Sequence, residues 1–332
     1  MEGKCVTYEK FGSPEQVLRI EHKSIRRPGI GELLVRMTSR PINPSDLIPV
    51  GGAYAHRIGL PAIPGYEGVG IVEETGPTVS RNWLGKRVLP LRGEGTWQQF
   101  VNAPAELAVL LPDTLDDDTA SQLYINPVTA WVTCTEVLQL KPDDVVVVNA
   151  CGSSIGRIYT QLSRILGFRL VAVTRSRSHT AELLEHGAVA VIQTDDPLNP
   201  LLHSTVMQLT NGVGANAAID SVGGASGMAL AYSARPGGKL LSIGLLSGKP
   251  LQAAEIAQKT GAKLMLFHLR HWNKQVSAET WQRTFRQLMS FIGSGQLRLC
   301  APSARFDLSD VKEAVRAAQS TEKGNGKIFL TG

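Results

Sequence analysis

The sequence has few cysteines and no long apolar run. Its four cysteines, Cys5, Cys134, Cys151 and Cys300, are widely separated. They form no CxxC pair and no Cys/His cluster with metal-ligand spacing. We therefore expect reduced thiols in a cytoplasmic protein. No apolar run reaches the length of a membrane span, and the first residues lack the features of a signal peptide, so we expect a soluble chain.

Charged residues are also scarce. They make up 19% of the chain and leave a net charge of +5, which is too dilute to predict nucleic-acid binding because the basic residues mostly do not cluster. The small excess of Lys and Arg favours anionic ligands such as phosphorylated cofactors or acidic carrier proteins. The chain has 332 residues, 43% of them hydrophobic, which is enough for two domains with full cores.

The first 120 or so residues show almost no helical periodicity. Short β-type runs alternate with turns that are rich in Gly, Pro and Asn, and this texture predicts a small, mostly β, barrel-like domain. The expected strands are Val6–Tyr8, Leu33–Met37, Gly70–Glu73, Arg87–Leu89 and Gln99–Asn102. The tail from Gln296 has the same texture, with strands expected at Arg305–Leu308 and Ile328–Leu330, so we expect it to complete this domain.

From about Leu123 the chain alternates apolar strands with amphipathic helices. Nearly continuous apolar runs are typical of parallel strands that are covered on both faces, so we predict an α/β fold with a doubly wound parallel sheet. The expected strands are Val145–Asn149, Leu170–Thr174, Ala190–Ile192, Ala217–Asp220 and Lys239–Ile243, and the expected helices are Ile155–Leu166, Thr180–His186 and Leu201–Leu209.

A glycine-containing loop follows the first of these parallel strands. The run NACGSSIG, residues 149–156, opens directly into a predicted helix. Small residues there let the backbone approach a pyrophosphate, which the free amides and the helix dipole stabilise. Cys151 and Ser153 stand where the usual G-x-G-x-x-G pattern has glycines, so the motif alone also fits a tight turn that binds no ligand.

The end of the second parallel strand indicates which dinucleotide is bound. An NAD-selective enzyme usually carries an Asp or Glu there to hold the ribose 2′-hydroxyl, whereas this chain has VTRSRS with Arg175 and Arg177. Guanidinium groups bind the 2′-phosphate of NADPH through charge-assisted hydrogen bonds. The pattern favours NADPH over NADH, and the alternative is two solvated arginines on a loop.

Two runs in the first half, NPSDLIPVGGAY (43–54) and LPAIPGYEGVGIVEETG (60–76), resemble the medium-chain dehydrogenases/reductases, which pair a GroES-like domain with a Rossmann domain. The zinc ligands of that superfamily's alcohol dehydrogenases are missing. The region of Asn43 to Asp46 has no cysteine, Tyr66 replaces the histidine, and Asn126 lies near the third position. We therefore expect no catalytic zinc.

Within that superfamily the chain is similar to the zinc-independent 2-enoyl thioester reductases of the mitochondrial type. The likeness extends over nearly the whole chain, through GTW (95–97), INPVTAW (125–131), NACGSSIG, VTRSR, DSVGG (220–224) and HLRHWNKQ (268–275). It implies NADPH-dependent reduction of an activated C=C bond, with hydride transfer to the β-carbon and protonation at the α-carbon. It also implies a role in fatty acid metabolism and a homodimer.

The resemblance also implies the site residues. The catalytic residue is Tyr54, and the substrate pocket includes Asn43, Trp97 and Trp272. The cofactor-binding residues are Asn126, Gly152, Ser153, Ser154, Ile155, Arg175, Ser176, Arg177, Ile243, Gly244, Leu245, Leu246, Phe267, His268, Leu269 and Lys327. His268 and Leu245 depart from the family pattern, which has a tryptophan and a glycine there, so the shape of the pocket is open. Asp220 is expected to cap its turn.

These observations predict a GroES-like catalytic domain at 1–121 and 297–332 and a Rossmann NADPH-binding domain at 122–296. An NADPH:quinone or general α,β-unsaturated carbonyl reductase is the first alternative. A non-catalytic NADPH-binding protein is the second. A short-chain dehydrogenase is disfavoured because Tyr159 is followed four residues later by Ser163 instead of a lysine. The sequence leaves the acyl carrier (coenzyme A or an acyl carrier protein), the chain length and the pathway open.

Overall fold

The computed structural model describes residues 2–194, 196, 200–320 and 326–332. The chain folds into two compact units. Unit 1 comprises Met1–Ile125, Ser277–Gly293 and Leu299–Gly332, and unit 2 comprises Asn126–Val276 and Ser294–Arg298. No helix among the described residues is long and apolar enough to cross a membrane.

Unit 1 is built mainly from strands, as its turn-rich sequence predicts. The strands are β1 (Glu2–Thr7), β2 (Arg19–Ser24), β3 (Glu32–Pro41), β4 (Val69–Thr75), β5 (Arg87–Leu89), β6 (Phe100–Pro104), β7 (Val109–Leu110), β14 (Pro302–Asp307) and β15 (Lys327–Thr331). The helices are α1 (Pro14–Val17), α2 (Pro44–Val50), α3 (Asp117–Ser121), α11 (Ala278–Gly293) and α12 (Val311–Gln319), with 3₁₀ turns η1 (Ala55–Arg57), η2 (Arg81–Trp83) and η5 (Leu308–Asp310).

The tail of the chain completes the sheet of unit 1. A seven-stranded sheet has the order β14-β15-β3-β4-β5-β7, with β6 also paired to β3, while β1 and β2 form a separate hairpin. In the register of β15 against β3, Phe329 faces Pro41 and Leu330 faces Arg40. The C-terminal strands β14 and β15 therefore lie in the same sheet as β3 and β4.

Unit 2 contains a parallel sheet with helices on both sides. Its strands are β8 (Val145–Val148), β9 (Arg169–Thr174), β10 (Ala188–Gln193), β11 (Ala215–Asp220), β12 (Ala234–Ser242) and β13 (Lys263–Leu266). Its helices are α4 (Ile125–Val132), with the π-helical turn η3 (Thr133–Val137), α5 (Ser154–Leu166), α6 (Thr180–His186), α7 (Pro200–Leu209), α8 (Gly224–Ser233), α9 (Ala253–Thr260) and α10 (Leu269–Gln275), and a 3₁₀ turn is η4 (Arg177–His179).

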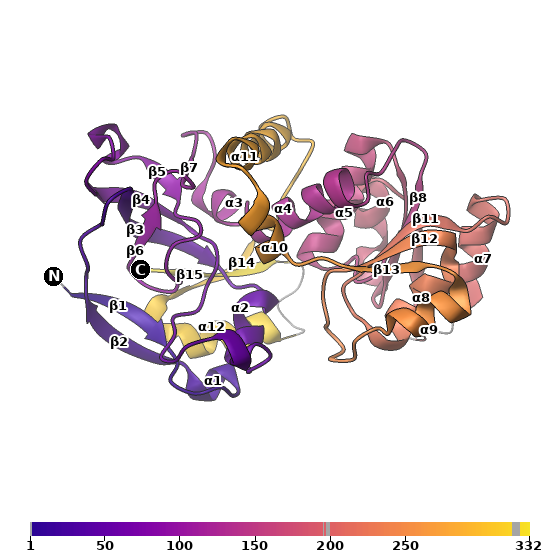
Figure 1. Cartoon of the computed structure of the whole chain (residues 1–332), viewed down its shortest axis with the longest axis horizontal. Helices are drawn as coiled ribbons and strands as arrows, with labels where there is room; N and C mark the ends of the chain where they lie inside the picture. Colours follow the sequence, from indigo (N-terminus) through magenta and orange to yellow (C-terminus); the bar gives the residue numbers. More distant parts are fainter. Residues whose placement is uncertain (1, 195, 197–199, 321–325) are drawn as a thin grey trace. The chain divides into compact units, whose positions relative to one another are not determined.

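The strand order in unit 2 is β10-β9-β8-β11-β12-β13, and every pairing is parallel. Numbered within the sheet, this is 3-2-1-4-5-6, the order of a doubly wound dinucleotide-binding fold. Helices α5 and α6 lie on one side of the sheet and α8 and α9 on the other (Figure 1). All four residues of β8 are buried, as expected for a central strand covered on both faces.

One helix belongs to a different unit from the one predicted. Helix α11 lies inside the predicted 122–296 domain but packs in unit 1. Its Trp281 and Phe285 are fully buried, and the indole N–H of Trp281 donates to the carbonyl of Leu107 over 2.9 Å. The ring of Tyr124 contacts both aromatic rings. This aromatic cluster, which joins segments distant in the sequence, is why the unit extends past the predicted boundary.

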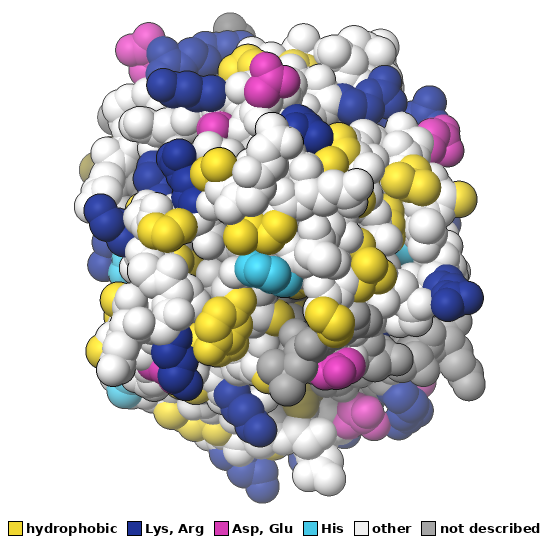
Figure 2. Space-filling view, turned by 90° about the vertical axis from the view of Figure 1, so that its right-hand side faces the viewer, with side chains coloured by type: hydrophobic (Ala, Val, Ile, Leu, Met, Phe, Trp, Pro, Cys, Tyr) yellow, Lys and Arg dark blue, Asp and Glu magenta, His cyan; other side chains and the backbone are white. Residues whose placement is uncertain are grey.

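The surface drawn in Figure 2 is mixed in character. Among the described residues on this face, hydrophobic side chains are interspersed with Lys, Arg and acidic side chains. The basic residues there are dispersed, which matches the low charge content of the chain.

Candidate functional site

The predicted cofactor residues of unit 2 gather at one edge of its sheet. Parallel strands place their carboxyl ends at the same edge, where doubly wound folds bind their ligands. Here the segments that follow β8, β9, β12 and β13 supply Gly152 to Ile155, Arg175 to Arg177, Ile243 to Leu246, and Phe267 to Leu269. Four sequence-predicted segments that span more than a hundred residues are thus brought to one edge of one unit.

The loop after β8 is shaped for a close approach of ligand and backbone. Ser153 is the N-cap of α5, and its hydroxyl accepts from the amide of Gly156 over 3.2 Å. A Cβ atom on Gly156 would lie 2.4 Å from the Cα of Cys151, so the helix can meet the strand only with glycine at this position. Cys151 itself is fully buried, which raises the pKa of its thiol to about 12.

The donors of this loop fit a dinucleotide phosphate. Among the described residues, the amides of Gly152 and Ile155 donate no hydrogen bond within the protein. They stand at the N-terminus of the 13-residue helix α5, where the helix dipole favours an anion. Ser153, anomalous for a generic glycine-rich loop, is used as the helix cap and does not obstruct the approach.

The loop after β9 presents exposed cationic side chains. Arg175, Ser176 and Arg177 are all exposed. The guanidinium of Arg177 donates to Gln193 over 2.7 Å, and the amide of Gln193 in turn donates to the carbonyl of Arg175 over 3.2 Å. Within the part of the chain that the structure describes, the guanidinium of Arg175 has no hydrogen-bond or ion-pair partner. The loop is therefore braced through Arg177 and leaves Arg175 available to an anion.

Buried polar side chains, Asn149 and Asp220, hold the chain in place at this edge of the sheet. The side-chain amide of Asn149 donates to Asp220 over 2.6 Å, and its oxygen accepts from the amide of Ser221 over 2.8 Å. Asp220 is fully buried and also accepts from the amides of Val222 and Gly223. This geometry confirms the prediction that Asp220 caps its turn.

The loops after β12 and β13 complete the edge. Gly244 is required because a Cβ atom there would lie 2.7 Å from the carbonyl oxygen of Ser221. Leu245 and Leu246 are exposed. His268 caps α10, where its Nδ1 accepts from the amide of Arg270 over 3.2 Å, and the indole of Trp272 donates to Glu136 over 2.9 Å. Asn126 lies in the first turn of α4.

The predicted catalytic tyrosine belongs to unit 1. Tyr54 is half-buried and precedes the 3₁₀ turn Ala55–Arg57. The Arg57 guanidinium carbon lies 3.8 Å from the centre of its ring. Gly52, two residues earlier, has a φ of +92°, a conformation that favours glycine. The Arg57 cation therefore packs on the face of the Tyr54 ring, a favourable cation–π arrangement.

Two other predicted residues, Asn43 and Lys327, meet in a buried polar network of unit 1. The ammonium of Lys327 donates to the side-chain oxygen of Asn43 over 2.5 Å, and the amide of Asn43 donates to Glu67 over 2.6 Å. Glu67 also accepts from the backbone amides of Tyr124 and Ile125. Glu67 was not among the predicted site residues, although it follows Tyr66 directly in the motif that replaces the zinc-binding one.

Asp46 is a second buried carboxyl group in this region. It accepts from the backbone amides of Asn43 and Tyr66 over 2.7 and 3.2 Å. Burial raises the pKa of Asp46 to about 7, opposed by the hydrogen bond from Asn43 and assisted by the nearby charge of Glu67. Partial burial, followed by the proximity of Asp46, also raises the pKa of the Tyr66 phenol. The region therefore contains side-chain oxygen atoms, of a carboxyl group and of a phenol, that can gain or lose a proton.

Trp97 differs from its predicted place. It is fully buried in the core of unit 1, and a Cβ atom on Gly65 would lie 2.2 Å from its ring. The structure places the indole beneath the Gly65 backbone and not on an accessible pocket wall. The family resemblance assigned this side chain to the substrate pocket, whereas the structure uses it for packing.

The residues at the former zinc-ligand positions do not fit zinc. Tyr66 offers a phenol and Asn126 an amide, whereas zinc in proteins is held by Cys, His and carboxylate groups. Both oxygens of Asp46 already accept backbone hydrogen bonds. Over the described ranges, no three His, Cys, Asp or Glu side chains gather at metal-binding distance.

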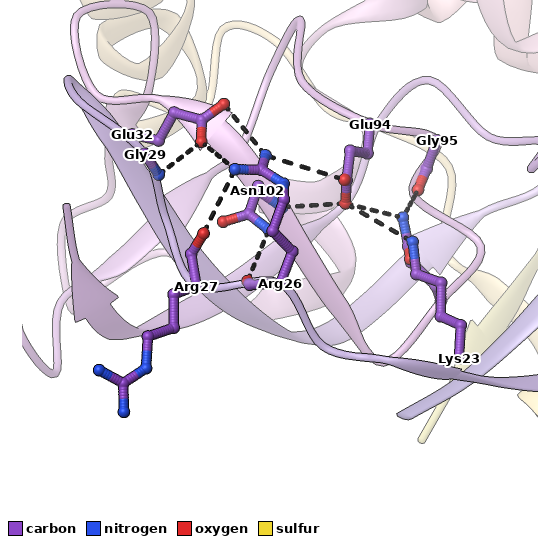
Figure 3. Close-up of polar contacts among 9 residues, drawn as sticks. Lys23, Arg26, Arg27, Gly29, Glu32, Glu94, Gly95 and Asn102 are labelled. Atoms are coloured by element: carbon purple, nitrogen blue, oxygen red, sulfur yellow. Dashed lines mark hydrogen bonds and ion pairs between the residues drawn. The ribbon is translucent and has the colours of Figure 1, made fainter. Parts of the chain in front are cut away.

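Figure 3 shows a separate group of charged side chains in unit 1. Glu94 lies 3.8 Å from Lys23 and 4.0 Å from Arg26, and Arg26 pairs with Glu32 over 2.7 Å. These pairs are partly exposed, and such pairs contribute about 0–1 kcal/mol each. They link β2 to the loop between β5 and β6. None of the predicted site residues lies there, so we assign this group a structural role.

Comparison with known proteins places the chain in a family. Residues 29–113 match the family described as "Alcohol dehydrogenase GroES-like domain", and residues 154–294 match "Zinc-binding dehydrogenase". The mitochondrial enoyl-[acyl-carrier-protein] reductase of Xenopus tropicalis is 31% identical over 99% of this chain and 96% of the relative.

Solved structures agree with this placement. A crystal structure from Bacillus thuringiensis, provisionally named an NADPH:quinone reductase, is 56% identical, with a TM-score of 0.97 over 100% of this chain and 99% of the other. A mycobacterial protein complexed with NADPH is 26% identical, with a TM-score of 0.87 over 99% and 100% of the two chains.

Fold and relatives together define the class of the protein as a medium-chain dehydrogenase/reductase, an oxidoreductase with a GroES-like and a Rossmann part. The chain belongs to the zinc-independent group of that superfamily which includes enoyl and quinone reductases. The predicted fold class and the prediction of an oxidoreductase are confirmed, and a non-catalytic protein is not supported.

Proposed function

We propose that the chain reduces the activated C=C bond of a trans-2-enoyl thioester, with NADPH as its cofactor. The cofactor assignment rests on the guanidinium of Arg175, which has no hydrogen-bond or ion-pair partner among the described residues and lies in the loop after β9 that Arg177 braces. A 2′-phosphate would supply the anion that this side chain lacks. The mycobacterial relative in complex with NADPH supports the same assignment.

The protein's part of the reaction is to bind, orient and stabilise charge. When bound, NADPH supplies the hydride that adds to the β-carbon. In unit 2 the amides of Gly152 and Ile155 would hold the pyrophosphate, and Arg175 with Ser176 and Arg177 would hold the 2′-phosphate. The proposed roles of Asn126, Ile243 to Leu246, and Phe267 to Leu269 are to line the remaining length of the cofactor. Lys327, bonded to Asn43 in unit 1, is proposed to act through that network.

Tyr54 is the proposed acid or orienting group. As the β-carbon takes the hydride, negative charge develops on the thioester carbonyl oxygen, and a hydrogen-bond donor stabilises it. The α-carbon then needs a proton. The phenol of Tyr54, held through its ring by Arg57, can serve either purpose. Trp272 and Asn43 are the proposed substrate neighbours.

A quinone reductase is the second candidate because of one specific relative. The Bacillus thuringiensis structure shares 56% identity, well above the 31% shared with the enoyl reductase of Xenopus tropicalis. Hydride transfer to a quinone needs the same cofactor site, and it does not need a proton delivered to carbon. The two functions therefore differ in what they require of Tyr54.

A substrate comparison tests the proposal. Purified protein would be given NADPH with crotonyl-CoA, with the matching acyl-carrier-protein thioester, and with a small benzoquinone, and kcat/KM would be measured for each. We expect the highest value for a thioester, with the saturated acyl chain as product. Efficient quinone reduction without turnover of either thioester would instead select the second candidate.

We also propose that the protein is a cytoplasmic homodimer. Strand β13 ends the sheet of unit 2 and exposes Leu266 at 80%, and an edge strand is a pairing site for a second sheet. Light scattering of wild type and of Leu266→Lys tests this, because the lysine should lower the measured mass to that of a monomer. The four free cysteines, three of them buried, support a reducing compartment.

A further inference from the structure

His179 lies against the loop 150–156, which we call the pyrophosphate loop, but it was not predicted to bind the cofactor. It ends the turn η4 (Arg177–His179), two residues after the second of the exposed arginines, and it is half-buried. A Cβ atom on Gly152 would lie 2.4 Å from Cδ2 and 2.7 Å from Nε2 of its ring. The Cδ2–Nε2 edge of the imidazole therefore covers Gly152 directly.

The other edge of the ring faces a group that can only donate. The Arg157 guanidinium lies 3.3 Å from Nδ1 of His179 and forms an ion pair with Glu182 over 3.1 Å. An arginine has five N–H donors and no acceptor, so Nδ1 of His179 must accept. In a neutral imidazole the proton then sits on Nε2, the nitrogen beside Gly152.

The charge around the ring favours this neutral form. Burial, followed by the positive charge of Arg157, lowers the pKa of His179, and Glu182 opposes the shift only in part. Arg157 is itself buried, and it lies in the first turns of α5, while Glu182 comes from α6. The imidazole therefore carries a donor N–H at Nε2 and lies between the pyrophosphate loop and the loop of Arg175 to Arg177.

We propose that His179 is a further cofactor-binding residue, which donates from Nε2 to a phosphate oxygen of NADPH, and that Arg157 is a positioning residue that fixes its tautomer. The inference rests on the proposed NADPH site at the loop 150–156. It explains why Gly152 must lack a side chain: the position is already covered by the ring. The phosphate is either in the pyrophosphate, beside Gly152, or on the adenosine ribose, which the adjacent arginines address.

Two substitutions of His179 distinguish a role as hydrogen-bond donor from a role that depends only on the size of the side chain. Glutamine carries its amide N–H about as far from the backbone as Nε2, whereas asparagine carries it only as far as Nδ1. We expect His179→Asn to weaken NADPH binding about tenfold or more, as for a lost hydrogen bond to a charged group. His179→Gln should restore affinity to within about twofold. His22→Asn, an exposed histidine on β2, is the matched control and should have no effect.

Three ligands identify the phosphate. Dissociation constants would be measured for NADPH, NADH and 2′,5′-ADP. Equal losses for NADPH and NADH in His179→Asn assign the contact to the pyrophosphate. Losses confined to NADPH and 2′,5′-ADP assign it to the 2′-phosphate. Unchanged affinity for all three ligands overturns the inference.

A parallel Arg175→Ala titration distinguishes this failure from failure of the proposed function. If Arg175→Ala weakens NADPH binding while His179→Asn does not, only the role of His179 is lost. If wild-type protein does not bind NADPH, the proposed function fails with it.

The tautomer is tested without any ligand. Nitrogen NMR of protein labelled at histidine distinguishes protonation at Nε2 from protonation at Nδ1. We expect Nε2–H for His179 at neutral pH and a mixture of the two forms in Arg157→Met, and circular dichroism would verify that the variant is folded. Protonation of wild-type His179 at Nδ1 would contradict the proposal.

Discussion

Lys327 donates a hydrogen bond of 2.5 Å to Asn43, although 284 positions separate them in the chain. The bond joins the first residue of β15 to the N-cap of α2, and it continues through Asn43 to Glu67. Both charged ends are buried. The neutral side chain of Asn43 thus links two buried charged groups. Its removal would take one hydrogen-bond partner from each of them.

Asn43→Ala should therefore destabilise unit 1. A buried polar group that loses its partner costs about 1–3 kcal/mol, and a charged group costs more, so we expect the free energy of unfolding in urea to fall by about 3 kcal/mol. Asn82→Ala, at an exposed asparagine in η2, is the control and should change it by less than about 0.5 kcal/mol. If Asn43→Ala lowered the free energy of unfolding by less than about 0.5 kcal/mol, the network would not stabilise the fold.

The raised pKa of Asp46 predicts a pH dependence of stability. Its pKa rises from an ordinary value of 3.8 to about 7 on folding, so the folded state binds the proton more tightly than the unfolded state. The stability associated with protonated Asp46 is present below pH 4 and is lost as the pH rises towards 7.

Asp46→Asn removes this titration while Glu67 remains in both proteins. The unfolding free energy of wild type relative to the variant should decline between about pH 4 and pH 7 and level off above. Parallel curves for the two proteins across that window would contradict the assignment.

Arg175 predicts selectivity between the two dinucleotides. Arg175→Ala should raise the Kd for NADPH about tenfold or more, because a charge-assisted hydrogen bond to the 2′-phosphate is lost. The Kd for NADH should stay within about twofold, since NADH lacks that phosphate. Equal effects on both cofactors, measured by fluorescence titration, would place Arg175 away from the 2′-phosphate.

Tyr54 is tested through turnover. Tyr54→Phe should lower kcat with an enoyl thioester by about 10²–10⁴-fold if the phenol supplies or orients the proton, with NADPH affinity unchanged. Tyr232→Phe, at a half-exposed tyrosine of α8, is the matched control. A drop of less than about threefold in Tyr54→Phe would remove this residue from the catalytic role.

Local sequence pattern predicts the parts of the fold in which one segment carries its own signal. Strand β5 and helix α6 have the predicted bounds, and the other predicted strands and helices overlap those of the structure, with ends that differ by at most five residues. In each case the apolar period or a bounding glycine, such as Gly167 after α5 with a φ of +81°, indicates the element directly.

Several contacts between distant segments were not predicted. Helix α11 joins unit 1 because Trp281 meets Leu107 and Tyr124, and no local pattern contains that pairing. Glu67 and His179 likewise acquire their significance from Asn43 and from Gly152. Trp97 shows the converse, because the family resemblance assigned it to the substrate pocket and packing placed it in the core. For Glu67, its position directly after Tyr66 was the one signal in the sequence that could have identified it.

The most direct test of the proposed chemistry follows the hydride itself. The protein would be given crotonyl-CoA and NADPH deuterated at the transferred position, and the acyl product would be analysed by mass spectrometry and NMR. We expect one deuterium at the β-carbon and a solvent-derived proton at the α-carbon. A product without deuterium, or with deuterium at any other carbon, would contradict it.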